Sequence, residues 1–241
     1  NEKNTIIKVI DKINELKLEK QLIVVDDYSE DGGRDLLIDN KNKVSNLILH
    51  KKNLGKGAAI KSAQEYIRGK FTIIQDADLE YDPSDFEQMI NFTQKNNLKV
   101  LYGSRVLEHA NREKIQNFSH KYRIFANYLL TKLNNFINNQ KLTDAHTCYK
   151  LFDSELFKSI NLEEKGFAFC PEVTTKISLL NHQINEIPIN YKGRSYKDGK
   201  KIKFVDGLDA IIALIKYRYF KNKWEHILKL ISAEFVILKK L

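Results

Sequence analysis

The sequence predicts an α/β domain with a mostly parallel sheet and helices on both of its faces. Short apolar runs of strand length alternate with segments of helical periodicity in the first half of the chain, as in parallel strands joined by crossover helices. Pairs of acidic residues directly follow two of those runs, at the strand ends where open parallel sheets bind ligands. The chain has 241 residues, 42% of them hydrophobic, enough for one large domain with a helical appendage.

Helices and strands alternate along the first half. The opening helix is placed at 4–18 because its apolar residues recur three and four positions apart. Each strand is a short run rich in Val, Ile, Leu or Phe, and each later helix follows a turn that contains Gly, Ser or Pro. The strands are expected at 22–25, 46–50, 71–75 and 99–103, and the later helices at 33–40, 58–68 and 83–96.

The second half is less regular. Its expected elements are a helix at 112–139, a strand at 148–152, a helix at 171–181, a strand at 184–191, a basic loop at 193–203 and two helices from 207 to 241. We expect one domain over 1–206, followed by amphipathic helices over 207–241. The chain also begins abruptly against its first helix, so a starting strand is expected to be missing.

Composition narrows the class of partner. The net charge of +9 and the isoelectric point of about 9.3 favour anionic partners, such as nucleotide diphosphates or phospholipid surfaces. We expect no nucleic-acid partner, since no RNA-binding or helix-turn-helix signature accompanies the charge. Cys148 and Cys170 make neither a disulfide framework nor a four-ligand zinc site. With no signal peptide and no bilayer-length apolar run, we expect a cytoplasmic protein.

The segment Gln75-Asp76-Ala77-Asp78 follows the run 71–74 directly. Two carboxylates one residue apart repel each other and favour a nearby cation. A hard divalent ion, Mg2+ or Mn2+, held by Asp76 and Asp78 together with substrate phosphates suits such a position. A solvated acidic turn is the commoner origin of an isolated Asp-x-Asp.

Two further segments point to a nucleotide. Asp26 and Asp27 end another apolar run, where a carboxylate accepts hydrogen bonds from a base or a ribose. The alternative is that Asp27 or Ser29 caps the next helix. Gly55-Lys56-Gly57 opens a helix, and helix N-termini with a Lys attract anions. The alternative there is an ordinary turn that needs Gly.

The motifs carry a family resemblance when taken together. They occur in the order Asn1-Glu2, Val24 to Gly32, Asn53 to Gly57, Gln75 to Pro83, Tyr102 to Arg105 and Cys148 to Phe152. In this order the chain resembles an inverting family 2 glycosyltransferase with the GT-A fold. Within that family it is most similar to the dolichyl- or polyprenyl-phosphate mannose and glucose synthases. Their usual starting strand, Pro-x-Tyr-Asn-Glu, is represented here only by Asn1-Glu2.

The resemblance implies roles for individual residues. Asp76 and Asp78 would be the D-x-D pair, with Asp78 the direct metal ligand. The donor would be a nucleotide-diphosphate sugar of the GDP-mannose or UDP-glucose class. Its expected contacts are Glu2, Asp26, Asp27, Lys56, Gln75, Asp76, Arg105 and Lys200. Arg194 would close on the diphosphate as a catalytic cation.

The acceptor decides whether the reaction needs a base. A lipid phosphate is already ionised, whereas a sugar hydroxyl needs a carboxylate to take its proton. The candidates are Asp144, at the position of the family's acceptor-side Asp, and Glu172, in the family's Phe-x-x-Glu helix start. The alternatives are that Asp144 is a cap and that Glu172 favours a helix N-terminus through the dipole. We expect transfer to a polyprenyl phosphate. The alternatives are transfer to a saccharide hydroxyl in the cell envelope and a non-catalytic nucleotide-sugar or membrane-surface binding module.

The C-terminal segment indicates where in the cell the protein acts. Apolar residues are interleaved with Lys and Arg from Leu208 onward, as in helices that lie in a bilayer interface. Packing on the sheet or between protomers is the alternative, which leaves a homo-oligomer open. We expect peripheral contact with the inner face of the membrane.

Overall fold

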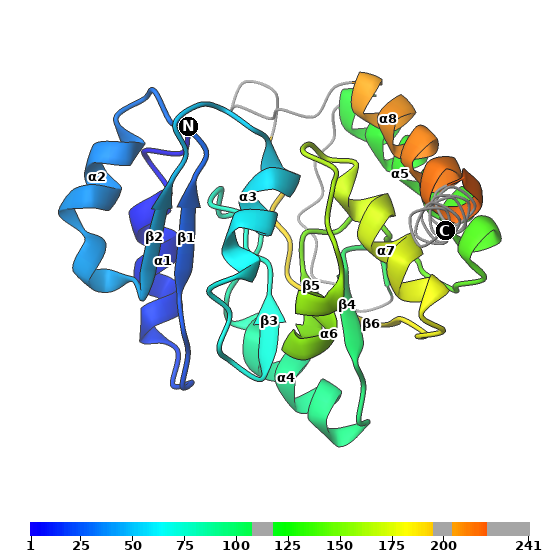
Figure 1. Cartoon of the computed structure of the whole chain (residues 1–241), viewed down its shortest axis with the longest axis horizontal. Helices are drawn as coiled ribbons and strands as arrows, with labels where there is room; N and C mark the ends of the chain where they lie inside the picture. The colour runs from blue at the N-terminus through cyan, green and yellow to red at the C-terminus, as the bar shows by residue number, and fades with distance from the viewer. Residues whose placement is uncertain (108–117, 195–203, 221–241) are drawn as a thin grey trace, which may run out of the picture.

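The computed structural model describes residues 1–107, 118–194 and 204–220, which form a layered α/β fold (Figure 1). Its strands are β1 (Ile23–Asp26), β2 (Asn46–Leu49), β3 (Phe71–Ile73), β4 (Val100–Ser104), β5 (Lys150–Asp153) and β6 (Asn185–Pro188). Its α-helices are α1 (Ile6–Glu15), α2 (Gly33–Asp39), α3 (Lys56–Gln64), α4 (Asp85–Lys95), α5 (Phe118–Asn138), α6 (Ser154–Ser159), α7 (Phe169–Leu179) and α8 (Phe204–Ile215). A 3-10 turn, Lys41–Lys43, and a π-helical turn, Lys216–Phe220, complete them. The predicted α/β class is confirmed.

The strands form two groups. β1 pairs with β2 in parallel, and the other strands follow the order β3-β5-β4-β6. β5 runs antiparallel to both of its neighbours, whereas β4 and β6 are parallel. Ile73 at the end of β3 pairs with Leu151, and Tyr102 near the end of β4 pairs with Lys150. The loop that leads into β5 therefore lies at the edge where β3 and β4 end.

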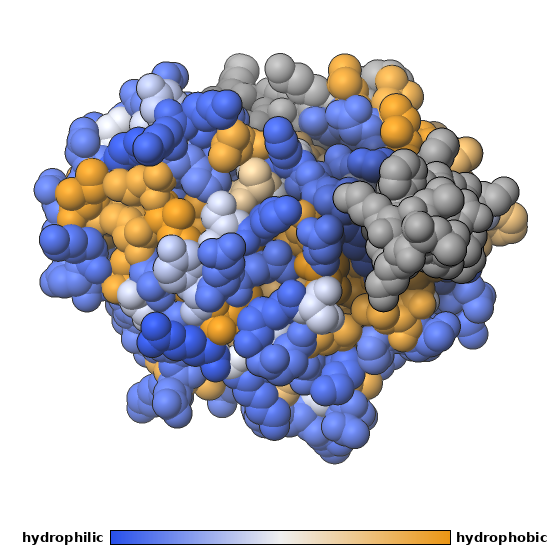
Figure 2. Space-filling view, viewed as in Figure 1, coloured by the Kyte–Doolittle hydropathy of each residue, from blue (hydrophilic) through white to orange (hydrophobic). Residues whose placement is uncertain are grey.

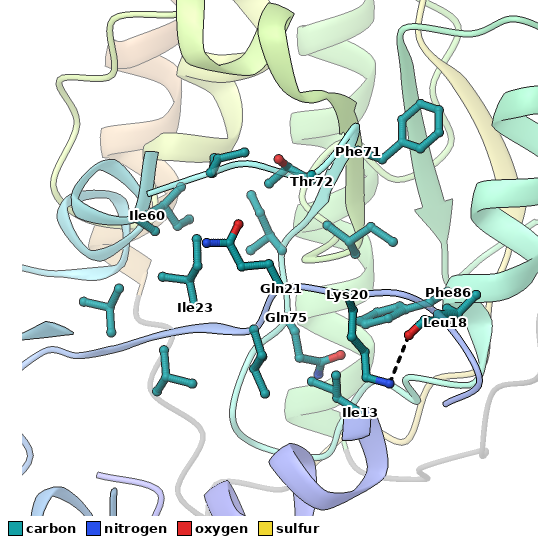
Figure 3. A pocket seen from close by; sticks show the side chains of 18 of the residues that line it. Ile13, Leu18, Lys20, Gln21, Ile23, Ile60, Phe71, Thr72, Gln75 and Phe86 are labelled. Atoms are coloured by element: carbon teal, nitrogen blue, oxygen red, sulfur yellow. Dashed lines mark hydrogen bonds between the residues drawn. The ribbon is translucent and has the colours of Figure 1, made fainter. Parts of the chain in front are cut away.

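A cavity separates the two groups of strands. It has a volume of about 980 Å³ and is walled by Ile13 of α1, Ile23 of β1, Ile60 of α3 and Phe71 of β3 (Figure 3). Within the described residues, β1 pairs only with β2 and β3 only with β5. The expected absence of a starting strand stays a prediction.

Apolar packing covers both faces of the larger group of strands. On one face, Phe152 and Phe157 stack with ring centroids 4.6 Å apart, beside the buried residues Val173 and Ile177 of α7. On the other face, Met89 of α4 packs with a second buried cluster. Burial on both faces explains the apolar residues of these strands, such as Val100, Leu101, Leu151 and Phe152. It also fixes the strand ends that carry the polar residues.

The structure differs from the prediction in a few elements. α6 was not expected; it starts because the Asp153 side chain accepts a hydrogen bond from the Leu156 amide at its N-terminus. α8 packs on α5 and α7, so part of the predicted tail lies against the domain. The second predicted tail helix, beyond Asn222, falls outside the described residues. The boundary at residue 207 stays a prediction.

A substitution at Gly57 would measure how tightly α3 packs. A Cβ there would lie 2.0 Å from the carbonyl oxygen of Glu164, although Ala normally stabilises a helix relative to Gly. We expect Gly57→Ala to destabilise the fold by about 1–3 kcal/mol, the usual range for overpacking. Thermal unfolding measures it. Gly69→Ala is the matched control, because its Cβ would meet only the Phe71 carbonyl at 3.5 Å. Equal melting temperatures for the two variants would contradict the packing.

Candidate active site

A second pocket, of about 450 Å³, lies where β1 and β3 end. It gathers side chains from distant parts of the chain. The predicted site residues that line it are Glu2, Asp26, Asp27, Lys56, Asp76, Asp78, Arg105 and Arg194. Tyr81, His146 and Tyr191 are also in its wall. The common edge of the strands explains why these residues meet.

Asp76 is paired with a lysine of its own chain. Lys56 Nζ lies 2.5 Å from Asp76 Oδ1 and 2.7 Å from Asp76 Oδ2. Burial disfavours both charges, but the mutual attraction raises the pKa of Lys56 and lowers that of Asp76. Gly55, at φ +94°, turns the backbone so that α3 starts with this lysine at the pocket. The Asp76 carboxylate is therefore ionised and neutralised by a neighbour.

Asp78 belongs to a larger cluster around Arg194. The guanidinium donates from Nη1 to Glu2 Oε2 at 2.9 Å and from Nη2 to Asp78 Oδ2 at 3.1 Å. The Arg194 amide donates to Glu80 Oε1 at 2.7 Å. Burial, then the negative charges of Asp76 and Glu80, raise the pKa of Asp78 to about 6. Arg194 Nε also lies 3.7 Å from Glu80 Oε1, so one guanidinium faces three carboxylates.

The backbone is strained beside both acidic pairs. Tyr28, next to Asp27, has φ of 65°, and Leu79, next to Asp78, has φ of 58°. Bulky residues rarely adopt this left-handed region. Such strain gathers at functional sites, where the surrounding structure holds it. The strain in these two turns therefore indicates a functional site at this edge of the sheet, independently of the charged residues there.

Asp26 and Asp27 each hold a partner from the protein. Asp26 accepts from Arg34 Nε at 2.7 Å; burial opposes its ionisation, but Ser29 and Arg34 lower its pKa. Asp27 accepts from the amides of Leu54 and Gly55, at 2.8 and 2.7 Å. Neither carboxylate caps α2, whose N-cap is Gly32. Asp27 instead fixes the turn that presents Lys56.

Asp144 and Arg105 form a buried pair. Arg105 donates from Nε to Asp144 Oδ2 at 2.7 Å and from Nη2 to Asp144 Oδ1 at 2.8 Å, while Asn127 reaches Oδ1 at 3.0 Å. Burial opposes its charge, yet Arg105 holds the pKa of Asp144 well below its usual value. Asp144 is fully buried and does not line the pocket, whereas Arg105 does. The geometry makes Asp144 the support of Arg105.

Glu172 anchors a loop. Its carboxylate is fully buried and accepts from the amides of Glu163 and Glu164, at 2.7 and 2.9 Å, and from Lys176 Nζ at 2.6 Å. The same loop packs on Gly57. Glu172 is not in the pocket wall. In this arrangement it positions the loop beside α3 and faces no reacting group.

One predicted donor contact lies outside this pocket, and another cannot be placed. Gln75 lines the cavity between β1 and β3 (Figure 3), where its Oε1 accepts from Tyr149 Oη at 2.6 Å. Lys200 falls outside the described residues. Sequence reasoning missed Glu80 and Tyr191, which share a hydrogen bond of 2.8 Å in the wall. The spacing of Glu80 from Asp78 was the available signal for the first. His146 carried no signal that set it apart.

The contacts of Asp76 and Asp78 determine whether this edge of the sheet can hold a divalent cation. Among the described residues, no three His, Cys, Asp or Glu side chains converge as a ready metal site. Asp76 and Asp78 offer the hard oxygen donors that Mg2+ and Mn2+ prefer, but they now hold Lys56 and Arg194. Arg194 Nε is buried without a hydrogen-bond partner. The donor set fits a divalent ion once these two cations turn away.

Proteins of similar sequence are glycosyltransferases. The chain is 28% identical over 233 residues to a dolichyl-phosphate beta-glucosyltransferase of Dictyostelium discoideum, which covers 88% of this chain and 67% of that protein. It is 26% identical over 172 residues to the low-salt glycan biosynthesis hexosyltransferase Agl6 of Haloferax volcanii, covering 71% of this chain and 40% of that protein.

A solved structure confirms the GT-A fold. Glucosyl-3-phosphoglycerate synthase from Mycobacterium tuberculosis, crystallised with Mn2+, uridine-diphosphate and glucosyl-3-phosphoglycerate, matches with a TM-score of 0.63. The match covers 90% of this chain and 76% of that one, at 15% identity, and so shows the fold alone. Residues 1–160 match glycosyl transferase family 2. The chain therefore belongs to glycosyl transferase family 2 and is a glycosyltransferase.

Proposed function

We propose that this chain moves a hexose from a nucleotide-diphosphate sugar to a polyprenyl phosphate, with inversion and with Mg2+ or Mn2+ bound. The observation that carries the proposal is the state of the two candidate bases. Asp144 and Glu172 are fully buried and saturated with hydrogen bonds outside the pocket. A hydroxyl acceptor needs a base, whereas a phosphate acceptor needs only positive charge around it.

Three cationic side chains are available for a phosphate in the pocket. Lys56, Arg105 and Arg194 all reach its wall from separate elements. Arg105 is held rigidly, because Asp144 grips two of its nitrogens and its guanidinium lies 5.1 Å from the Tyr191 ring centroid. A fixed guanidinium suits a phosphate oxyanion. We assign the acceptor phosphate to Arg105.

The donor would lie across the strand ends. Its nucleoside would meet Asp26 at the end of β1, and its diphosphate would meet Asp78, Lys56 and Arg194 at the end of β3. Asp76 and Asp78 would hold the divalent ion. A bound Mg2+ or Mn2+ supplies Lewis-acid stabilisation of the departing diphosphate. Lys56 and Arg194 add fixed charge to the same group.

A membrane-bound acceptor agrees with the surface of α5 and α8. Phe125, Tyr128 and Leu129 of α5 and Leu208 and Ile212 of α8 are exposed. Figure 2 shows apolar side chains gathered over these helices at its upper right. Apolar side chains that are exposed together are typical of partner or membrane contact. None of the described helices has the length and apolarity to cross a bilayer.

We extend the proposal to peripheral contact with the membrane, at its cytoplasmic face. The names of the Dictyostelium and Haloferax relatives, a dolichyl-phosphate beta-glucosyltransferase and a glycan-biosynthesis hexosyltransferase, support the same class of reaction.

Transfer to lipid phosphate is tested directly. The protein is incubated with Mn2+ or Mg2+, a panel of nucleotide sugars and a short polyprenyl phosphate, and lipid-linked hexose is read by mass spectrometry. We expect one donor to give product, and Asp78→Asn to lower the rate at least about 100-fold, as loss of a main electrostatic contact does. Lys99→Gln, on an exposed pair with Asp153, is the control. Product on a saccharide hydroxyl and none on lipid phosphate would overturn the acceptor assignment.

Glu172→Gln separates an anchor from a base. An amide cannot accept from both loop amides, so we expect a lower melting temperature but less than a tenfold loss of kcat in the folded protein. A true base would contribute about 10²- to 10⁴-fold. Thermal unfolding and initial rates at low temperature measure the two effects. An unchanged melting temperature with a loss beyond 100-fold would show that Glu172 is the base.

A further inference from the structure

His146 has a buried polar atom with no partner. Its side chain is in the pocket wall, and its Nε2 is buried without a hydrogen bond. Native proteins rarely leave such atoms unpaired, and each instance calls for an explanation. An unmet donor or acceptor costs roughly 1–3 kcal/mol. His146 lines the pocket, but this nitrogen has almost no accessible surface in the present conformation, so the ring has to turn for a ligand group in the pocket to reach it.

The loop around His146 is held on both sides. Lys150 Nζ donates to the carbonyl of Ala145 at 3.1 Å and to that of Thr147 at 2.5 Å. The Ala145 amide donates to Thr131 Oγ1 at 3.2 Å, and the Cys148 amide donates to Tyr81 Oη at 2.9 Å. The backbone that carries His146 is therefore fixed before any ligand binds.

A lysine such as Lys150 is an unusual residue for holding a buried loop in place. It is fully buried on β5, and its ammonium lies 4.3 Å from the Tyr102 ring centroid. Burial lowers the pKa of Lys150, a sign that the charge is held there at a cost. Apolar side chains of similar size are the usual choice on such a strand. The arrangement preorganises the loop that presents His146.

The position of His146 indicates which part of a ligand it meets. Asp26 ends β1, Asp78 follows β3, and His146 precedes β5, the next strand beyond β3. Arg105 follows β4, one strand further on. A donor with its nucleoside at Asp26 and its diphosphate at Asp78 therefore brings its hexose toward His146, ahead of the acceptor site at Arg105.

The protonation state favours a hydroxyl as the partner. Burial and the positive charge of Lys150 lower the pKa of His146 to about 4, so the imidazole is neutral near pH 7. A neutral imidazole has one donor and one acceptor nitrogen, which matches a hydroxyl. A group with so low a pKa is also a weak base.

We propose that His146 is a specificity-determining residue that hydrogen-bonds a hydroxyl of the transferred hexose. This inference rests on the proposed function only for the donor, a nucleotide-diphosphate sugar. It does not depend on the acceptor. Lys150 acts through His146 as a positioning residue, by fixing the carbonyls on either side.

Binding of deoxy donors tests the assignment without any acceptor. Calorimetry with Mn2+ compares the selected nucleotide sugar with its monodeoxy analogues in wild type, His146→Phe and His146→Gln. We expect one deoxy position to weaken binding to wild type by about tenfold, near the value of one hydrogen bond. His146→Phe would not distinguish that analogue. His146→Gln, whose amide both donates and accepts, would retain the difference.

Several results would overturn the proposal. Equal losses for every analogue in wild type and His146→Phe would show that His146 does not contact the sugar. If His146→Gln binds donor normally but loses more than 100-fold in kcat, His146 is a base instead. His146→Ala replaces the Phe variant if the latter unfolds, as seen by circular dichroism. Wild type that binds no nucleotide sugar would reject the proposed function as well, whereas a wrong acceptor would leave this test unaffected.

Discussion

Charge neutralisation at the ends of β1 and β3 is the constraint on which the pocket depends. Glu2, Asp76, Asp78 and Glu80 converge there, and the chain answers them with Lys56 and Arg194. Carboxylates that are partly or fully buried are costly without a partner, so these two cations hold the edge of the sheet together. Four acidic groups against two basic ones leave a negative excess, which matches the charge of one divalent ion.

A second set of carboxylates supports the first. Asp27 fixes the turn before Lys56, Asp144 grips Arg105, and Glu172 anchors the loop that packs on Gly57. The oxygens of each of these carboxylates accept hydrogen bonds from groups of the protein. The cations that face the pocket are thereby placed before a ligand arrives, which is the condition for electrostatic preorganisation. None of these three carboxylates is available as a base. For this reason we favour a phosphate acceptor over a hydroxyl acceptor.

The sequence predicted the fold class and most of the pocket, because strand-end carboxylates and a Gly-Lys-Gly helix start have local signatures. Asp26, Asp76, Asp78 and Lys56 meet as expected. The burial of Asp144 and Glu172 could not be predicted, since their hydrogen bonds come from residues elsewhere in the fold. The reversed direction of β5 was equally invisible, because an apolar run carries no sign of its orientation. His146 was missed because only the tertiary fold leaves its Nε2 buried and unpaired.

The most direct test of this account is the affinity of the free protein for Mn2+, measured by electron paramagnetic resonance without nucleotide. If Arg194 occupies Asp78 in place of a metal, Arg194→Gln will bind Mn2+ several-fold more tightly than wild type, because one competing cation is gone. Arg68→Gln removes a guanidinium outside the pocket wall and will match wild type. Unchanged or weaker Mn2+ binding by Arg194→Gln would contradict the exchange of internal cations for a metal ion.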